Sequence, residues 1–493
     1  MRTELLPRLS AVVAAAAIAF SSFTGCAVGP NYQAPDMQPP FAYHGATALA
    51  ARDGETPAAA LNAWWRGFDD PELARIVDRT IAQNLDLAAS RERVAQARAA
   101  AARAGASRLP EAGVDGSVAR ERQSLRSPLG EIASRSPGYE RTQTLSDIGV
   151  GASWETDLAG GLRRGDEAAD AELAVAQAEH AGVRVSLAAE AADAYLRVRG
   201  AQARIAIAQR QIDDESQLVD LVKLRQDKGL GTVREVAQAE GLLLQAQATV
   251  PPLRREMASQ LFRLDVLTGV APGTSEAEVT ATPVAFKVPA IASAGGPAEL
   301  LRRRPDVIAA ERRLAASSAR IGVAIAGYYP SFSLSGALGF ESLDTGKLLT
   351  ASAFQPAALA GLHWRLFDFG RVDAEVAQAR GANREALLRY RQSMLRATED
   401  VENAIVALTE LESQHALLAK EVDAHLQARD AAQDAYRGGA VSLVEVLDED
   451  RQLLAAQDLL ASVRTDDARS AVAAFRALGG GWTLPSDAQV AER

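Results

Sequence analysis

Five histidines and many carboxylates are the side chains of this 493-residue chain that could serve as acids, bases or metal ligands. The histidines are scattered, and no two of them lie at helical spacing: His44, His180, His363, His415 and His425. The sequence contains no nucleophile motif, P-loop or dinucleotide-binding fingerprint. Aspartate and glutamate on long helices are usually solvated. We therefore expect a protein that is not an enzyme and that holds neither a metal nor ATP.

Cys26 is the only cysteine, and it follows a short apolar stretch, residues 10–23. An apolar stretch of about 14 residues near the N-terminus is typical of a secretory signal and is too short to span a bilayer as a helix. The residues just before Cys26 resemble a bacterial lipobox, in which residues 1–25 are removed and the cysteine carries lipid. Ala27, rather than aspartate, favours outer-membrane sorting. The alternative is an ordinary leader followed by an incidental thiol. Apart from this covalent lipid, no cofactor is expected.

Composition limits the remaining possibilities. The chain is 48% hydrophobic but only 5% aromatic, and it is rich in alanine, leucine, arginine and glutamate, which is typical of long helices and coiled coils. Its formal net charge of −10 argues against nucleic acid as a partner, because phosphates require clustered cationic surface. Beyond the leader there is no run of 18 apolar residues. If the mature chain crosses a membrane, it must do so with strands.

The chain is internally duplicated. Asp86 matches Asp306 at an offset of 220 residues, whereas Trp154 matches Trp364 at an offset of 210. The difference of ten residues must fall between these pairs, where residues 124–144 read as a polar loop. A duplication constrains the architecture before any element is assigned. We expect each half to be one structural unit of about 200 residues.

Each half predicts a helix, a hairpin, a very long helix, a tight turn and a further helix. Apolar residues recur every seven positions in the long segments, which indicates coiled-coil packing. The first segment would be roughly 100 Å long at 1.5 Å per residue. Glu215 and His415 interrupt the two apolar series, whose members are Val198, Ile205, Ile212 and Val219 in the first half and Leu387, Met394, Val401, Leu408 and Val422 in the second.

Two similar signatures predict the turns between paired helices. A glycine supplies the left-handed residue that ends one helix, and an S/T-x-x-E capping box begins the next. The same device occurs twice, 210 residues apart, which makes chance an unlikely origin. The turn residues are Gly229, Thr232 and Glu235 in the first half and Gly439, Ser442 and Glu445 in the second.

The hairpin segments have the two-residue periodicity of strands. Residues 145–154, 331–340 and 357–366 alternate apolar with small or polar residues, and 114–120 is a weaker first strand. Alternation over 9 to 11 residues is the signature of a membrane barrel; the alternative is one soluble sheet face buried under helices. Lipid tolerates no open sheet edge, and four strands cannot close. Two chains would supply eight strands and three would supply twelve.

The chain resembles the TolC-like outer-membrane efflux proteins, in their lipoprotein branch. The resemblance covers nearly the whole mature chain. One departure is that Ala159 and Gly161 replace the aromatic residue and the arginine usual after the first hairpin, which leaves the local packing there open. The motifs that carry the resemblance are CAVGPNYQAP (26–35), WWRGFDDPELARIV (64–77), WETDLAGGLRRG (154–165), WRLFDFGRVD (364–373), YRGGAVSLVEVLDEDRQLL (436–454) and LGGGW (478–482).

The resemblance implies a mainly α fold with a membrane β-barrel. Each chain would give four barrel strands and a long coiled-coil helical tunnel, closed by trimerisation. It implies a homotrimer in outer-membrane lipids, working with a periplasmic adaptor protein and an inner-membrane pump. Residues 64–84, 268–304 and the C-terminal part would form a belt around the tunnel. The implied activity is passive export of small molecules.

The resemblance also implies a gate at the periplasmic tip. Tyr436, Val444, Asp448 and Arg451 occupy the matching positions, and Glu235 stands where the family has an acidic partner for the arginine. We expect Val444 and Asp448 to line the constriction in three-fold rings, and Glu235 and Arg451 to latch it. Three facing carboxylates would favour cations. The alternative is that Asp448 and Arg451 are an ordinary surface pair worth a few tenths of a kcal/mol.

Two rival functions remain open. A structural coiled-coil lipoprotein without a pore would explain the cysteine and the heptads but not the duplicated hairpins. A duct for protein secretion would explain the heptads and the duplicated hairpins, although such ducts usually lack a lipobox. The expected segments are the signal peptide 1–25, the anchor segment 26–70, helices 71–110, hairpin 111–157, the tunnel 163–267, the equatorial segment 268–304, helix 305–330, hairpin 331–367, the tunnel 370–478 and the tail 479–493.

Overall fold

The computed structural model describes residues 27–36, 43–45, 47, 60–280, 287–289, 291 and 303–483. The chain divides into two compact units. The first contains residues 95–174 and 311–388 with the N-terminal segment, and the second contains 36–94, 175–310 and 389–493. Each unit draws on both halves of the duplication. The expectation that each half is one structural unit is therefore wrong, because the strands of both halves pair in one sheet and the helices of both halves share a core.

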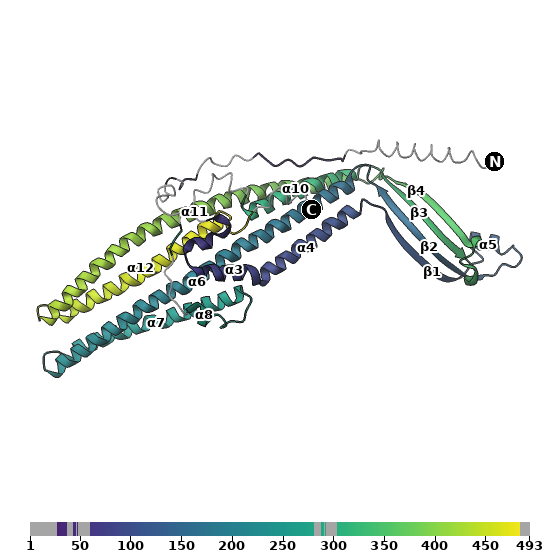
Figure 1. The fold of residues 1–493 in the computed structure, drawn as a ribbon. Helices are drawn as coiled ribbons and strands as arrows, with labels where there is room; N and C mark the ends of the chain where they lie inside the picture. The colour runs from purple at the N-terminus through teal and green to yellow at the C-terminus, as the bar shows by residue number, and fades with distance from the viewer. Residues whose placement is uncertain are drawn as a thin grey trace. The chain divides into compact units, whose positions relative to one another are not determined.

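The first unit contains a single antiparallel sheet (Figure 1). Its strand order is β1-β2-β3-β4, so every neighbour in the sheet is also the neighbour in sequence. β1 and β4 each pair on one side only among the described residues. The strands are β1 (Glu111–Arg122), β2 (Thr142–Thr156), β3 (Ser331–Ser342) and β4 (Phe354–His363).

One face of this sheet is apolar and exposed. Val114, Val150, Leu338 and Pro356 lie directly opposite one another across the four strands. Val114 is 72% exposed, Val150 52% and Leu338 62%. These large apolar side chains face one another across the strands and are exposed. The alternative interpretation of the alternation, a sheet face buried under helices, does not fit this exposure.

The hairpin boundaries differ in detail from the sequence expectation. β1 begins at Glu111 rather than near Val114, and a short helix, α5 (Pro128–Ala133), interrupts the loop expected to be irregular. β4 ends at His363, one residue before Trp364. The Trp364 indole donates to the carbonyl of Tyr328 at 3.0 Å, and Trp154 makes the equivalent bond to Arg108 at 2.9 Å. Each tryptophan thus ties a hairpin to the end of the helix before it.

The N-terminal segment 27–36 is fastened to two helices of the first unit. The Arg164 guanidinium on α6 donates to the carbonyl of Val28 at 3.0 Å and to the Asn31 side chain at 2.7 Å. Gly29 has φ +89°, and a Cβ there would come within 2.5 Å of Gly322 on α10 (Pro305–Ala326). This close approach explains the glycine in the CAVGPNYQAP motif.

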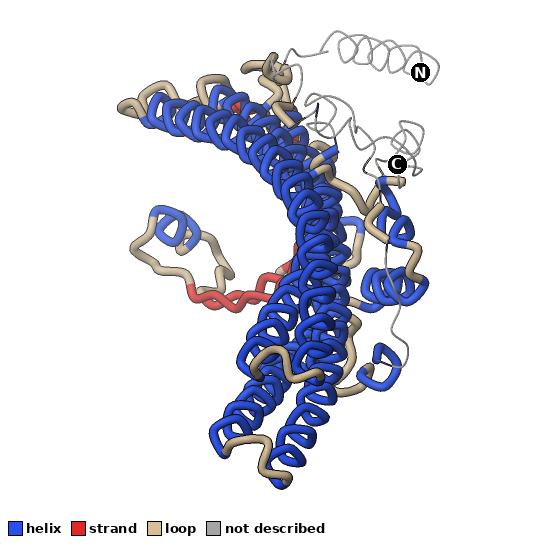
Figure 2. Tube along the Cα trace, turned by 90° about the vertical axis from the view of Figure 1, so that its left-hand side faces the viewer, coloured by secondary structure: helices blue, strands red, loops and turns tan. Residues whose placement is uncertain are grey.

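Four long helices dominate the described chain. Helices are the blue segments of Figure 2. Two have 67 residues and two have 35, so the duplication is preserved in element length: α6 (Gly161–Asp227) with α7 (Val233–Leu267), and α11 (Arg371–Arg437) with α12 (Leu443–Ala477). At 1.5 Å per residue the longer helices extend roughly 100 Å. α7 continues through Pro251 and Pro252.

The heptad positions are largely buried. In α6, Val198 and Val219 are 0% and 4% exposed, and in α11, Val401 and Leu408 are 1% and 0% exposed. Alanines fill the positions between them, with Ala397 fully buried. Small residues at these positions allow the helices to approach closely, near the lower end of the 8 to 10 Å range.

A compact aromatic layer in the second unit is built around the WWRGFDD motif. Trp64 is fully buried and stacks on Phe475 with ring centroids 5.3 Å apart. Asp70 accepts hydrogen bonds from the amides of Glu72 and Leu73, and from the Tyr195 hydroxyl at 2.6 Å. The smaller helices of this unit are η1 (Leu61–Phe68), α3 (Pro71–Gln83) and α8 (Glu276–Thr280). α4 (Leu85–Ala106) begins in this unit and ends in the first.

Several expectations fall outside the described residues. These are the leader, the lipid acceptor Cys26, and residues 281–286, 292–302 and 484–493. Within the described part of the chain, no helix is both long and apolar enough to cross a membrane. The same residues contain no group of three or more His, Cys, Asp or Glu side chains arranged to hold a metal.

Candidate functional site

The turn between α6 and α7 is held by its own backbone and by a capping box. Gly229 has φ +72°, a conformation that favours glycine. The amide of Leu230 donates to the carbonyl of Arg225 at 2.8 Å, and the amide of Thr232 donates to the Glu235 carboxylate at 2.6 Å. The hydroxyl of Thr232 in return accepts from the Glu235 amide at 3.3 Å. The orphan groups at both helix ends are thereby satisfied.

The turn between α11 and α12 repeats this geometry. Gly439 has φ +73°, and the amide of Ala440 donates to the carbonyl of Ala435 at 2.8 Å. The amide and hydroxyl of Ser442 both donate to the Glu445 carboxylate, at 3.2 and 3.1 Å. All six expected turn residues therefore lie in two equivalent helical turns.

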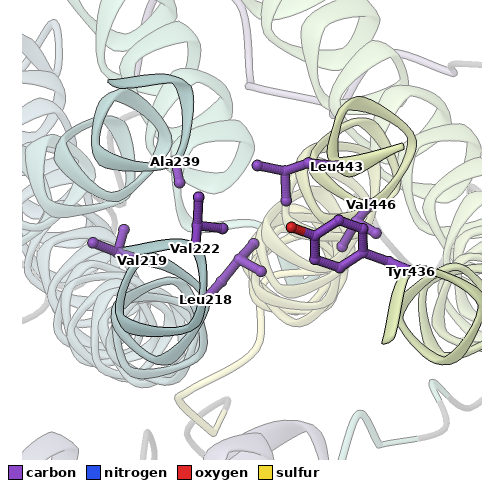
Figure 3. Packing of buried hydrophobic residues seen from close by; sticks show 7 residues of the cluster. All are labelled: Leu218, Val219, Val222, Ala239, Tyr436, Leu443 and Val446. Carbon is purple, nitrogen blue, oxygen red and sulfur yellow. The ribbon is translucent and has the colours of Figure 1, made fainter. Parts of the chain in front are cut away.

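A hydrophobic cluster joins the two helical hairpins just above their turns (Figure 3). Tyr436 lies within it, 5% exposed. The Arg225 guanidinium lies 4.7 Å from the centre of the Tyr436 ring, in a cation–π contact. Burial raises the pKa of the Tyr436 hydroxyl. Tyr436 thus fixes α11 against α6 instead of presenting its ring to solvent. The other members are Leu218, Val219, Val222, Ala239, Leu443 and Val446.

Val444, Asp448 and Arg451 lie on one exposed face of α12, at spacings of four and three residues. Val444 is 49% exposed. The three side chains line a groove of about 670 Å³ together with Gln238 and Gln245 of α7. The structure thus brings the three expected gate residues of α12 together on an open surface.

Glu235 and Arg451 are engaged separately. The Glu235 carboxylate is held by the backbone and hydroxyl of Thr232, and these hydrogen bonds lower its pKa. Arg451 forms an ion pair with Asp448 on its own helix at 2.5 Å. Within the described part of this single chain, the expected latch between Glu235 and Arg451 is not among the ion pairs formed.

A buried polar layer beside the hydrophobic cluster was only half anticipated. In the sequence, Glu215 interrupts the apolar series, whereas the predictions do not include Asp450. Both are buried, at 1% and 2% exposure. The signal for Asp450 was present, because it follows Leu443 and Val446 at spacings of seven and four residues and therefore shares their face of α12.

Comparison with known proteins gives one consistent result. The family model described as outer membrane efflux protein matches residues 76–270 and 296–480. The pyoverdine export outer membrane protein OpmQ of Pseudomonas putida is 34% identical over 91% of this chain and 93% of its own length. The toluene efflux pump outer membrane protein TtgF of Pseudomonas putida is 29% identical over 94% of this chain and 95% of its own length.

The solved structure of the outer-membrane channel OprN has a TM-score of 0.83 and 33% identity, and the alignment covers 93% of this chain and all of that one. The agreement confirms the expected fold of long paired helices with four antiparallel strands. The family model confirms the resemblance to outer-membrane efflux proteins drawn from the motifs, and the lipoprotein branch stays a prediction.

Proposed function

The chain belongs to the outer membrane efflux protein family and is therefore a non-enzymatic outer-membrane efflux channel; we propose that it works as the passive, gated duct of a tripartite system. The observation that carries this proposal is the sheet. β1 and β4 each lack a second partner strand within the described chain, while large apolar side chains cover one exposed face. Lipid permits such a sheet only when its edges are closed.

Closure requires further copies of the chain. We propose a homotrimer, whose twelve strands would form the barrel. Three copies of α6, α7, α11 and α12 would then form the periplasmic tunnel, with its tip at the turns after Asp227 and Arg437. Since the sequence predicts no ATP site, we propose that energy comes from partners, namely a periplasmic adaptor and an inner-membrane pump.

We propose small molecules as the cargo. The names of two relatives refer to pyoverdine export and to toluene efflux. These molecules differ widely in polarity, which supports a duct that accepts what its pump delivers. Protein secretion remains the rival cargo class, but no observation on the described residues favours it.

We propose that Val444 and Asp448 line the constriction at the tip. Their exposure on one face of α12, four residues apart, supports this role. In a trimer each would occur as a ring of three, and the aspartate ring would favour cations. Arg451 partly neutralises each Asp448 within the same helix. Any latch involving Glu235 would then have to join neighbouring chains.

We propose lipid attachment at Cys26 as the anchor. The segment that directly follows Cys26 is hydrogen-bonded to Arg164 and approaches Gly322 closely. These contacts support a fixed position for the chain next to its lipid anchor. Intact-mass measurement of the mature protein tests this. A mass increment matching acyl chains on a chain that begins at Cys26 would support the anchor, whereas an unmodified thiol would overturn it.

A further inference from the structure

Two carboxylates buried between the helical hairpins have too few hydrogen-bonding partners. Glu215 of α6 and Asp450 of α12 are 1% and 2% exposed. One oxygen of each, Glu215 Oε2 and Asp450 Oδ1, has no hydrogen-bond partner. Buried polar atoms are nearly always paired, so each exception requires an explanation. Nothing in the helical turns or the proposed constriction uses these two groups.

The surrounding charges do not balance the acids. On α6, Gln211 donates to Glu215 Oε1 at 2.6 Å, and Asp214 lies beside it. On α11, Arg429 is 3.9 Å from Asp450 Oδ1 and 3.6 Å from Asp214. The closest contact of Arg429 is with its neighbour Asp430, at 2.7 Å. The Arg429 guanidinium is thus shared among three carboxylates. The fourth carboxylate, Glu215, accepts a hydrogen bond only from a side-chain amide.

Two further groups complete the polar environment of this layer. Gln433 of α11 hydrogen-bonds the Asp450 carboxylate. His425 of α11 faces Glu449 of α12 at 3.4 Å, one residue before Asp450 along that helix. A buried carboxylate without a full set of partners is costly when charged and much less so when protonated.

The positions of Glu215 and Asp450 link their charge to the packing of the two helical hairpins. Glu215 lies three and seven residues from Leu218 and Val222, and Asp450 lies four residues from Val446, so both share the faces that form the hydrophobic cluster. The pair and the cluster are therefore consecutive layers of the seam between the α6–α7 hairpin and the α11–α12 hairpin. Any charge placed in this layer acts directly on the packing of the two hairpins just above the proposed constriction.

We propose that Glu215 and Asp450 form a proton-binding lock: with protons bound the two hairpins pack tightly, and loss of the protons places facing negative charges in the seam and loosens it. This inference rests on the proposed function only where loosening is taken to ease opening of the duct. The lock itself is a property of the seam.

The expected pH range follows from the local environment. Burial, followed by the neighbouring Asp450, raises the pKa of Glu215 to about 7. Burial raises the pKa of Asp450 to about 6, although Arg429 opposes the shift. A carboxyl whose pKa is higher in the folded than in the unfolded state stabilises the fold fully below the unfolded pKa, and this stabilisation is lost as pH rises from the unfolded to the folded pKa. The seam should therefore be tightest below about pH 4, where both carboxyls are protonated even in the unfolded chain, weaken as pH rises towards about 7, and change little at higher pH.

The first test is thermal unfolding of the purified oligomer as a function of pH. Glu215→Gln and Asp450→Asn, singly and combined, replace the carboxyls by amides of similar shape. We expect the double variant to gain in unfolding midpoint over the wild type as pH rises from about 4 to about 7, with little difference at the acid end and a constant difference above about pH 7. Asp213→Asn, two residues from Glu215 but exposed, should follow the wild type throughout.

A second test links the lock to the duct. In planar bilayers, we expect wild-type conductance to rise with pH over the same range and the double variant to lose most of that dependence. Equal pH dependence of wild type and double variant in both measurements would overturn the lock. If the wild type conducts at no pH while the unfolding midpoints still separate, the proposed function fails and the lock stands.

Discussion

Asp448 and Arg451 form a close ion pair on the surface of α12, with side chains 47% and 61% exposed. Exposed pairs of this kind contribute about 0.2 to 1 kcal/mol to stability. The pair is therefore too weak to hold the helices in place by itself. Its effect in a trimer would be electrostatic, because each arginine compensates one carboxylate of the ring.

Replacing Arg451 by alanine tests this compensation. Arg451→Ala removes the cationic partner of Asp448 in each chain and leaves only the Gln452 amide as donor. We expect higher single-channel conductance with little change in the unfolding midpoint, since the ion pair is exposed. Arg437→Ala is the matched control, because Arg437 forms a similar exposed pair with Asp434 before the turn. Unchanged conductance of Arg451→Ala would contradict a role for this arginine at the constriction.

Asp448→Asn tests the carboxylate directly. The substitution keeps the shape of the side chain and removes three charges from a trimer. We expect the preference for cations, read from the reversal potential in a salt gradient, to fall clearly. Glu256→Gln, on α7 far along the chain from the turns, should leave the reversal potential unchanged. A preserved cation preference in Asp448→Asn would place the selective charges elsewhere.

At the scale of the elements, two helical hairpins owe their sharp turns to one glycine each. Gly229 and Gly439 have φ values of +72° and +73°, and a Cβ at either would meet no atom within 4 Å. Sterically there is room for a side chain, so any effect of substitution arises from the backbone conformation alone. The two turns thereby allow the strain of a left-handed residue to be measured without a clash.

Gly439→Ala should lower stability by roughly 1 kcal/mol, because alanine in the left-handed conformation is strained. Gly241→Ala is a matched control on α7: the site is equally open but lies inside a helix, where alanine is about 1 kcal/mol better than glycine. The two variants should therefore shift the unfolding midpoint in opposite directions. A shift of the same sign for both would contradict the turn geometry.

Much of this element structure could be predicted from the sequence. Heptads, capping boxes and alternation are local patterns, and they gave the long helices, both turns and all four strands. The exact strand ends and α5 were missed, because short segments such as residues 128–133 carry no clear periodicity. Asp450 was also missed: its spacing from Leu443 and Val446 places it on their face of α12, but a lone carboxyl on a long helix is usually solvated, and its burial depends on packing against α6 and α11.

At the scale of the whole molecule, the duplication does not give two domains. The two halves have helices of identical length, yet each compact unit combines segments from both. Sequence comparison shows which segments are equivalent, but it does not show which of them pack together. The sheet shows why: β2 and β3 belong to different halves and pair along eleven residues of each strand.

The open sheet leads to a prediction about assembly. Since β1 and β4 each have one described neighbour, we expect other copies of the chain to close the sheet. The proposed homotrimer predicts that the detergent-solubilised protein has the mass of three copies. Native mass spectrometry measures this directly, and light scattering with correction for detergent is an independent check. A folded monomer with the same helical content would show that the sheet does not need other copies to close.

The most direct test of the gated duct is single-channel recording from the purified, mature wild-type protein in a planar bilayer. We predict discrete, low conductance steps with a preference for cations. Silent bilayers, in which insertion of the folded oligomer has been verified, would contradict the account of a duct that conducts by itself.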